Sequence, residues 1–514
     1  MPQCAMRRPT VSVLGALLLG VLVLGGAAWL RGAEYDEQYS RFLLAGDARP
    51  AWPADIFSAA EARERFEGAA SPAGIAAELR RTDVHPPLYF WLAATWRAAI
   101  GGSLRDLRLL SVLCGVGALG AVGMTARRAA IPPALAMLLT LGCYAFAYTG
   151  AVARGFALAQ LLALLGVLAA LHGERSGEDR GAAGAGLLLG AAAFTNYLAA
   201  FLAVPVVLWL TLRRLRHGVA AALAALPFAA ADLWFLAAQH ASRPDQFQTF
   251  RLARAVARLA TLGAASIAGG LPLYAPPALS GPLAAACASL VAAAAMLTAA
   301  RFGRIGAPRP RLLLAGLAAA PPLGLLLLGA LSGNTPIELR YLAFATPYAA
   351  LLMAGALASL PRPAMAAGAG SLLAVQAAAI AGLMLRPETM QPMRQAAREA
   401  AAPGGADSGE PALVLLPRGN DGVGIVGAFA SEAPGGMRLL LIDAATRPDA
   451  LRGLASRIAL ARLDRDADSA AAIAAMQARL AADPCWRERQ RSARVSFYDN
   501  LCGPSGWTST TAAR

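Results

Sequence analysis

The sequence predicts a polytopic α-helical membrane protein with a small α/β domain at its C-terminal end. Hydrophobic residues make up 57% of the 514 positions and charged residues only 15%, and the mean hydropathy is +0.51. A soluble chain of this size could not bury so much apolar surface, because globular proteins average about 25% charged residues. Apolar runs of about 20 residues, long enough to cross a bilayer, recur up to residue 385. After that point the composition becomes that of a soluble domain.

The basic residues predict the orientation of the chain. The formal net charge is +15, and all 46 basic residues are arginines. A basic chain raises the question of nucleic-acid binding, but these arginines occupy short turns between apolar runs, as the positive-inside rule describes. We therefore expect no nucleic-acid partner and expect the arginine-rich turns to face the cytoplasm. These turns are Arg127-Arg128, residues 172–180, 213–217 and 301–311, and Arg362.

Eleven apolar runs are long enough to be read as full spans. The first follows Arg7 and Arg8, and its length favours an uncleaved span over a signal peptide. With eleven spans every arginine-rich turn is cytoplasmic, residues 31–105 form a periplasmic loop and the C-terminal segment is periplasmic. The spans cover residues 10–30, 106–125, 130–148, 152–171, 182–197, 198–212, 219–238, 281–300, 311–330, 341–360 and 364–385.

Two further apolar stretches, residues 86–101 and 257–275, do not fit the eleven-span scheme as full crossings. The first is short and begins with two prolines. We read both as juxtamembrane or re-entrant helices at the outer surface, which is allowed where protein covers the backbone. The alternative is that both cross the bilayer, which gives thirteen spans. Membrane lipids are partners in either case.

The chain is expected to divide into a membrane domain, residues 1–385, and a periplasmic α/β domain, residues 386–514. Residues 412–417, 437–443 and 457–464 read as strands and residues 469–481 as a helix. The GNDGVG turn at 419–424 lacks the lysine and the glycine spacing of a phosphate loop, so we read it as a strand-to-helix turn.

Two cysteines of the hydrophilic segment, Cys485 and Cys502, flank its last predicted strand, ARVSFYDN. Paired cysteines in a soluble segment favour a disulfide when that segment lies in an oxidising compartment. We therefore predict that they form a disulfide that fixes the end of the chain.

Polar residues collect at the predicted outer ends of the spans. Arginine near a membrane costs free energy unless it is paired or interfacial, and snorkelling to the headgroups is the simplest explanation. A bound lipid phosphate is a second explanation, because a guanidinium group matches phosphate oxygens bidentately. A nearby carboxylate could then act as a general base on an acceptor hydroxyl. The outer residues are Asp36, Glu37, Asp83, His85, Arg154, Asn196, Tyr197, Glu338, Arg340 and Tyr341.

Five segments resemble, in the same order, bacterial family-39-type glycosyltransferases with the GT-C fold, which include protein mannosyltransferases and aminoarabinose transferases. The most specific part is the Asp36-Glu37 pair followed by the His-Pro-Pro-Leu-Tyr segment that begins at His85. The matching segments are AEYDEQYSRFLLAGD at 33–47, then residues 83–116, ARGFALAQLLALL at 153–165, TNYLAAFLAVPVVLW at 195–209 and ELRYLAFATPYAALL at 338–352.

The resemblance implies an inverting glycosyltransferase of the bacterial inner membrane. Such enzymes take a sugar from a polyprenyl-phosphate or polyprenyl-diphosphate carrier at the periplasmic face and transfer it to a lipid, glycan or protein acceptor. The resemblance implies that Asp36 is the general base and that Glu37 orients the acceptor or holds a cation. The resemblance implies that no cofactor is required. It leaves a divalent metal possible beside Asp36 and Glu37, since some GT-C enzymes use one, but two adjacent carboxylates are too few ligands to support it.

The resemblance also implies a site for the lipid phosphate. His85 stands where many relatives have lysine, and histidine is only partly protonated near neutral pH. Arg154 and Arg340 would therefore be the compensating cations. Tyr197 and Tyr341 would donate hydrogen bonds to the phosphate or the sugar.

Two other classes of function compete with this interpretation. A transporter or flippase has no chemistry of its own and should place its charges near mid-membrane on broken helices, whereas the polar residues here cluster at one surface. A non-catalytic relative could instead serve as a subunit of a complex. The presence of Asp36, Glu37, Arg154 and Arg340 together argues against this second alternative.

Overall fold

The computed structural model describes residues 7–46, 52–239, 248–402, 412–420 and 422–503. Asp421, in the GNDGVG turn, lies outside the described residues. The chain forms two compact units, and each is described by itself. The membrane unit contains Met1–Leu30 and Pro72–Arg386, and the sheet unit contains Arg31–Ser71 and Pro387–Arg514.

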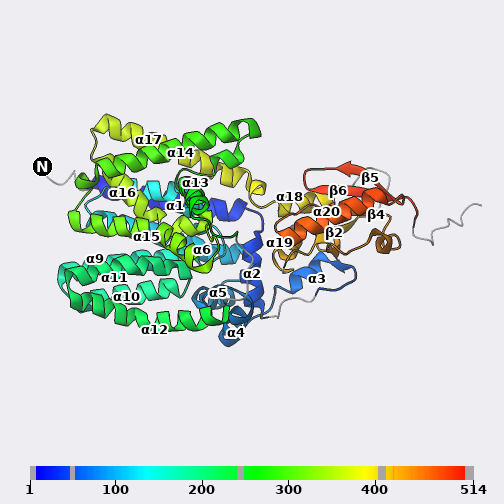
Figure 1. Ribbon diagram of the computed structural model, residues 1–514, viewed down its shortest axis with the longest axis horizontal. Helices are drawn as coiled ribbons and strands as arrows, with labels where there is room; N and C mark the ends of the chain where they lie inside the picture. The colour runs from blue at the N-terminus through cyan, green and yellow to red at the C-terminus, as the bar shows by residue number, and fades with distance from the viewer. Residues whose placement is uncertain (1–6, 47–51, 240–247, 403–411, 421, 504–514) are drawn as a thin grey trace, which may run out of the picture. The chain divides into compact units, whose positions relative to one another are not determined.

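The membrane unit is built from helices (Figure 1). Short 3-10 turns interrupt the connections at η1 (Tyr197–Ala199), η2 (Leu271–Tyr274), η3 (Phe302–Arg304) and η4 (Leu339–Phe344). The helices are α1 (Arg7–Leu30), α4 (Pro72–Thr82), α5 (Leu88–Ala99), α6 (Leu104–Arg128), α7 (Pro133–Gly142), α8 (Tyr144–Gly150), α9 (Phe156–Ser176), α10 (Asp179–Ala193), α11 (Ala200–Arg213), α12 (Leu215–Gln239), α13 (Leu252–Ala268), α14 (Pro277–Ala300), α15 (Pro308–Ser332), α16 (Thr346–Ala358) and α17 (Arg362–Leu385).

The prediction of a polytopic helical membrane protein is confirmed. Within the described ranges seven helices are long and apolar enough to cross a bilayer, and α7 with α8 would make an eighth span, bent by 75°. The other predicted spans correspond to the shorter helices α10, α11 and α16. The two further apolar stretches, residues 86–101 and 257–275, contain α5, with 12 residues, and α13, with 17 residues. Neither is among the helices long and apolar enough to span.

Small residues let neighbouring helices of this unit pack closely. Helices α9, α10, α11 and α12 lie side by side (Figure 1). A Cβ atom added at Gly186 of α10 would lie 1.9 Å from the carbonyl oxygen of Ala221 of α12. A Cβ atom at Gly181 would lie 2.6 Å from Gly173 Cα of α9. Because lipid chains provide no hydrophobic drive for association, such close backbone contact is a main source of packing energy between helices in a membrane.

The arginine-rich turns meet at one end of the membrane unit, which we call the arginine end. Arg175 Nη2 donates to the carbonyl oxygen of Arg128 at 2.7 Å. The Glu174 carboxylate accepts hydrogen bonds of 3.1 Å from both Arg213 and Arg309. Helix α9 runs from Phe156 to Ser176, so Arg154 lies at its opposite end. We call that opposite end the polar end.

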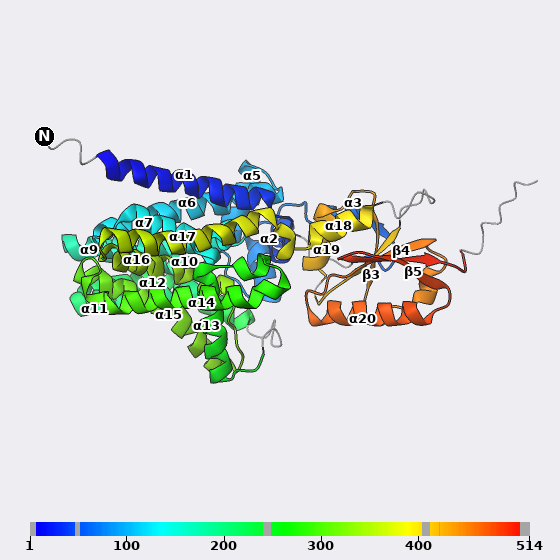
Figure 2. The same ribbon diagram turned by 90° about the horizontal axis from the view of Figure 1, so that it is seen from above.

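The sheet unit contains six strands and several short helices (Figure 2). Its helices are α2 (Tyr35–Ala45), α3 (Ala59–Glu64), α18 (Met393–Ala401), α19 (Gly424–Glu432) and α20 (Ala467–Ala482), with 3-10 turns η5 (Pro387–Thr389) and η6 (Pro448–Leu451). Its strands are β1 (Phe57–Ser58), β2 (Leu413–Pro417), β3 (Arg438–Ile442), β4 (Arg457–Ala461), β5 (Trp486–Arg491) and β6 (Val495–Asn500).

The strands follow the order β1-β3-β2-β4-β6-β5. β2 pairs in parallel with β3 and with β4, and the other pairs are antiparallel. Helix α20 covers one face of the sheet, while α18 and α19 cover the other (Figure 2). All five residues of β2 are buried, as expected for a central parallel strand covered by helices on both faces.

One boundary between the units falls after Arg386, next to the expected residue 385, but the sheet unit also includes a segment of the first outer loop. Residues 31–71 pack with the C-terminal segment rather than with the spans. Phe57 of β1 pairs with Leu439 of β3, and a Cβ atom at Gly427 of α19 would lie 2.5 Å from the ring of Phe66. A strand of two residues has no sequence signature of its own, so only the pairing reveals it.

Candidate active site

His85 lies in the connection between α4 and α5, at the polar end of the membrane unit. Its Nδ1 atom is 3.0 Å from Asp83 Oδ1, and the side chains are 23% and 4% exposed, respectively. The backbone N–H of Val84 donates to the same Asp83 oxygen at 2.7 Å. Pro86 and Pro87 then direct the chain into α5, with Pro87 at the N-cap. The short connection therefore holds a buried carboxylate against the imidazole ring.

Arg154 lies in the turn that enters α9 and is only 6% exposed. Its Nη2 atom is 3.0 Å from His85 Nε2 and 3.4 Å from His85 Nδ1. A Cβ atom at the next residue, Gly155, would lie 3.1 Å from both the carbonyl oxygen of Thr195 and Tyr89 Cβ. Only a glycine leaves these backbones so close without displacing a neighbour. The structure thus brings Asp83, His85 and Arg154 together.

Tyr197 joins the same group through Gln239, the last residue of α12. Tyr197 Oη donates to Gln239 Oε1 at 2.8 Å. Gln239 Nε2 in turn donates to the carbonyl oxygens of Leu79 and His85, both at 3.0 Å. The side chain of Gln239 is almost fully buried, at 1% exposure. One amide thus ties Tyr197 to the backbone of His85.

Arg340 and Tyr341 lie in η4, which packs near the same group. Arg340 Nε is 2.7 Å from Glu338 Oε2, and its guanidinium carbon is 5.5 Å from the Tyr341 ring centre. Tyr341 packs in a hydrophobic cluster that also includes Leu198 of η1. The ring centres of Phe344 and Phe156, at the start of α9, are 6.1 Å apart. The segment with Arg340 therefore lies beside both η1 and the entry to α9.

Asp36 and Glu37 belong to the sheet unit, in the first turn of α2. Glu34 caps this helix, and its backbone N–H donates to Glu37 Oε2 at 3.1 Å, which completes a capping box. Glu37 is fully buried, and Asp36 is partly exposed. The positive end of the helix dipole favours negative charge at both positions. Of the two carboxylates, Asp36 is the one that is open to solvent.

The chain before α2 is fixed by its own unit. Ala33 N–H donates to Glu432 Oε1 of α19 at 2.6 Å, and Arg394 Nε donates to the other oxygen of that carboxylate at 2.9 Å. Arg31 forms a buried ion pair with Glu34. The turn that contains Asp36 is therefore held by bonds to α18 and α19.

Cys485 and Cys502 form a disulfide with Cα atoms 5.1 Å apart, the pairing that the sequence predicts. It joins the residue before β5 to the residues after β6. Among the described side chains, no group of three or more His, Cys, Asp or Glu residues is arranged to hold a metal ion.

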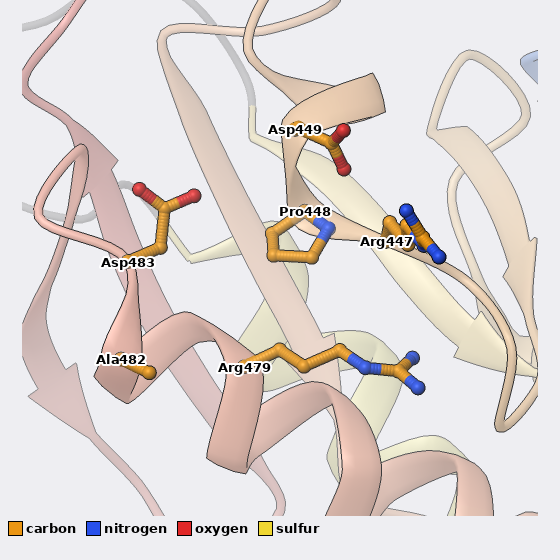
Figure 3. Close-up of a pocket in the computed structure, with 6 residues that line it drawn as sticks. All are labelled: Arg447, Pro448, Asp449, Arg479, Ala482 and Asp483. Carbon is orange, nitrogen blue, oxygen red and sulfur yellow. The ribbon is translucent and has the colours of Figure 1, made fainter.

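A surface hollow of the sheet unit lies between η6 and the end of α20 (Figure 3). Two of its charged groups are used internally. Arg479 Nη1 donates to the carbonyl oxygen of Thr446 at 2.6 Å, and Asp483 accepts from Arg452 at 2.8 Å. None of the predicted site residues lines it. The lining residues are Arg447, Pro448, Asp449, Arg479, Ala482 and Asp483.

Sequence reasoning missed Gln239. In the sequence, a polar residue at the end of an apolar run indicates only the end of a helix. The hydrogen-bond partners of Gln239 in the structure show that it connects α12 to two other segments. Asp232, also in α12, carried a clearer signal, since an ionisable residue inside a span is uncommon and often functional. It lies seven residues before Gln239 and therefore on a similar face of the helix.

No protein-family model matches the sequence, and no curated protein sequence matches it. Among solved structures the chain is similar to ArnT from Cupriavidus metallidurans bound to undecaprenyl phosphate, with a TM-score of 0.51 and 12% identity over 96% of this chain and 99% of that one. The same protein in its apo state gives a TM-score of 0.51 and 13% identity over the same shares.

The chain has the GT-C fold. The likeness spans nearly the full length of both proteins, so it includes the C-terminal sheet domain as well as the spans. At this level of identity it shows the fold alone, because one fold supports many activities.

Proposed function

We propose that this protein is an inverting glycosyltransferase that transfers a sugar from a polyprenyl-phosphate carrier to a lipid, glycan or protein acceptor. The observation on which the proposal depends is the buried Arg154 guanidinium in contact with the His85–Asp83 pair at the polar end of the membrane unit. Asp83 already places one negative charge in this group, and the Arg154 guanidinium could in addition match the oxygens of a lipid phosphate bidentately. A lipid phosphate is located at the ends of membrane spans, where this group lies.

The first requirement of such a transfer is a place for the leaving phosphate. As the bond between the sugar and the phosphate oxygen breaks, negative charge increases on that phosphate. A preorganised guanidinium stabilises this charge more strongly in a dry site than in water. Arg154 would be the main cation that binds the phosphate, and Arg340 in η4 would be a second one. Tyr197 and Tyr341 would donate hydrogen bonds to the phosphate or the sugar.

The second requirement is a base for the acceptor. We assign this role to Asp36, which is partly exposed in the first turn of α2. Its carboxylate would take the proton of the acceptor hydroxyl while the acceptor oxygen attacks the anomeric carbon opposite the departing phosphate. This geometry inverts the anomeric configuration. Glu37 would hold the turn in place through the capping box.

Chain connectivity supports this assignment. Asp36 follows Leu30, the last residue of α1, by only six positions. Near that end of α1, the carbonyl oxygen of Ala28 accepts a hydrogen bond of 2.9 Å from Arg108, which lies near the start of α6. Helix α6 ends at Arg127 and Arg128, which belong to the arginine end. The end of α1 is therefore at the polar end of its unit.

The likeness to ArnT also supports the proposal, because that protein was solved with undecaprenyl phosphate bound. By the positive-inside rule the arginine end would face the cytoplasm. The polar end and the sheet unit would then lie on the periplasmic side of the bacterial inner membrane. A transporter is less well supported, because the interacting polar side chains sit at one end of the helices.

The test is a complementation experiment read by mass spectrometry of envelope lipids and glycans. A deletion strain receives the wild-type gene, the Asp36→Asn variant, or Asp449→Asn as a matched control at an exposed carboxylate of the same unit. We expect the deletion to remove a sugar, which the control restores. Asp36→Asn should lower transfer by about 10²- to 10⁴-fold, the usual contribution of a general base.

Two outcomes would contradict the proposal. Full restoration by Asp36→Asn at normal membrane levels would show that Asp36 is not the base. An unchanged set of lipids and glycans in the deletion strain would argue against sugar transfer and favour the transporter.

A further inference from the structure

The contact between Arg154 and His85 has an unusual geometry. Arg154 Nη2 is 3.0 Å from His85 Nε2 and 3.4 Å from His85 Nδ1. A hydrogen bond in the plane of the imidazole to one nitrogen would leave the other nitrogen on the far side of the ring and much farther away. Two similar distances place the guanidinium nitrogen over the ring face instead. Arginine commonly stacks on aromatic faces in this way.

The ring below the guanidinium is held from several sides. Asp83 Oδ1 accepts from Nδ1 at 3.0 Å and thereby sets the rotation of the imidazole. Phe90 meets it edge-on, with ring centres 6.5 Å apart and an interplanar angle of 74°. Gln239 Nε2 holds the backbone carbonyl of His85 at 3.0 Å. These contacts fix the plane on which Arg154 rests.

The imidazole contacts one negative and one positive group. The Asp83 carboxylate meets it at Nδ1, and the Arg154 guanidinium lies over its face. Gln239 and Tyr197, which face the group from α12 and η1, are uncharged. A protonated His85 would place a second positive charge directly under the guanidinium, where like charges repel at short range.

We infer that His85 is a positioning residue, whose flat ring, oriented by Asp83, directs the Arg154 guanidinium toward the lipid phosphate. The inference rests on the proposed function, and it reassigns His85 from a phosphate-contacting cation to the support of one. Residue 85 then supports phosphate binding through the face of its ring and not through a charge. A phenylalanine would keep the ring face but lose the hydrogen bond to Asp83, and a lysine would supply no ring face.

The test is binding of undecaprenyl phosphate to the full-length protein in lipid nanodiscs. His85→Phe keeps a ring face without an ionisable group, His85→Lys supplies a charge without a face, and His85→Ala supplies neither. The matched control is His172→Phe, at an exposed histidine near the arginine end of α9. We expect the control to match wild type. We expect H85F to bind at least about tenfold more tightly than H85A, which is the size of a desolvated cation–π contact.

The inference is overturned if H85F binds undecaprenyl phosphate as weakly as H85A. It is also overturned if H85K is the one variant of the three that binds as tightly as wild type. If wild type itself does not bind undecaprenyl phosphate, the proposed function fails. The role of His85 is then decided by thermal unfolding without ligand. Arg154→Gln should lower the Tm in wild type and in the H85F background but much less in the H85A background. An equal loss of Tm in the wild-type, H85F and H85A backgrounds would overturn the inference independently of any activity.

Discussion

Gln239 shows how much of the polar end depends on one uncharged side chain. Its amide donates to two backbone carbonyls and accepts from Tyr197, so its oxygen and its nitrogen both have partners. It joins α12 to the loop of His85 and to η1. Buried polar groups of this kind stabilise a structure only when all their partners are present.

At this residue we predict that Gln239→Leu destabilises the protein by about 2–3 kcal/mol, because it removes the hydrogen bonds that Gln239 makes to the His85 carbonyl, the Leu79 carbonyl and the Tyr197 hydroxyl. The measurement is thermal unfolding of the purified protein. Gln248→Leu is the matched control, since the Gln248 side chain is exposed. A Tm for Gln239→Leu equal to that of the control would show that these hydrogen bonds add no stability.

Two substitutions of Glu37 can separate a structural role of this residue from a direct role in the reaction. Glu37→Gln preserves an oxygen that can accept from the Glu34 N–H, whereas Glu37→Ala removes it. We expect the alanine variant to lose about 1 kcal/mol of stability, typical of a lost helix cap. The glutamine variant should keep both its stability and its transfer activity. A stable but inactive Glu37→Gln protein would instead give the carboxylate charge a direct role in the reaction.

Among the elements, the β5–β6 hairpin at the edge of the sheet is constrained by a disulfide at its base. The disulfide links Cys485 and Cys502, which are 17 residues apart. Asp483 accepts from the Cys485 N–H at 2.9 Å and from Arg452 at 2.8 Å. The hydrogen bond from Arg452 is the main reason that the pKa of Asp483 lies below its ordinary value. Residues outside the strands thus secure the start of the hairpin.

For this element we predict that removal of the disulfide destabilises the sheet unit by about 3 kcal/mol, the value for a loop of this length. The variant is the double change Cys485→Ser and Cys502→Ser, measured by thermal unfolding with and without a reductant. Reductant should lower the Tm of wild type to that of the double variant and leave the variant unchanged. An identical Tm for the oxidised wild type and the double variant would contradict this.

On the scale of the whole molecule, the arginine-rich turns and the polar group occupy opposite ends of the same helices. Helix α9 has Arg154 before its first residue and Arg175 in its last turn. Helix α12 has Arg216 in its first turn and ends at Gln239. This polarity is independent of any resemblance, and it makes the orientation testable.

We predict that a reporter fused after Arg386 is active only in the periplasm and that one fused after Gly177 is active only in the cytoplasm. The reason is the cost of moving arginine-rich turns across the membrane. Fusions after Arg128 and after Gly306 serve as further cytoplasmic controls. Cytoplasmic activity of the Arg386 fusion would overturn both the eleven-span count and the proposed location of the site.

Some features could be predicted from the sequence because they depend on local pattern. The spans follow from runs of apolar residues, and the strands near 412–417 and 457–464 follow from short β-branched and leucine-rich runs between turn residues. The Cys485–Cys502 pair follows from position alone. His85, Arg154 and Tyr197 could be singled out because polar residues at span ends are costly without a partner.

Other features depended on contacts between distant segments. The membership of residues 31–71 in the sheet unit required the pairing of Phe57 with Leu439, which no local pattern indicates. The capping role of Glu37 and the bridging role of Gln239 depend on which atoms are within hydrogen-bond distance. From the sequence alone His85 is expected to carry a partial positive charge, whereas in the structure its ring face lies beneath Arg154.

By itself, then, the sequence determined the membrane class, the division of the chain into spans and a soluble domain, and the residue types at the polar end. Hydropathy and charge act locally, so they can be read along the chain. Only the tertiary structure decided which of these residues meet and in what orientation. Arg154 and His85 could meet either by stacking or through a hydrogen bond in the plane of the ring. The packing of α4, α5, α9 and α12 around His85 decides which of these two arrangements forms.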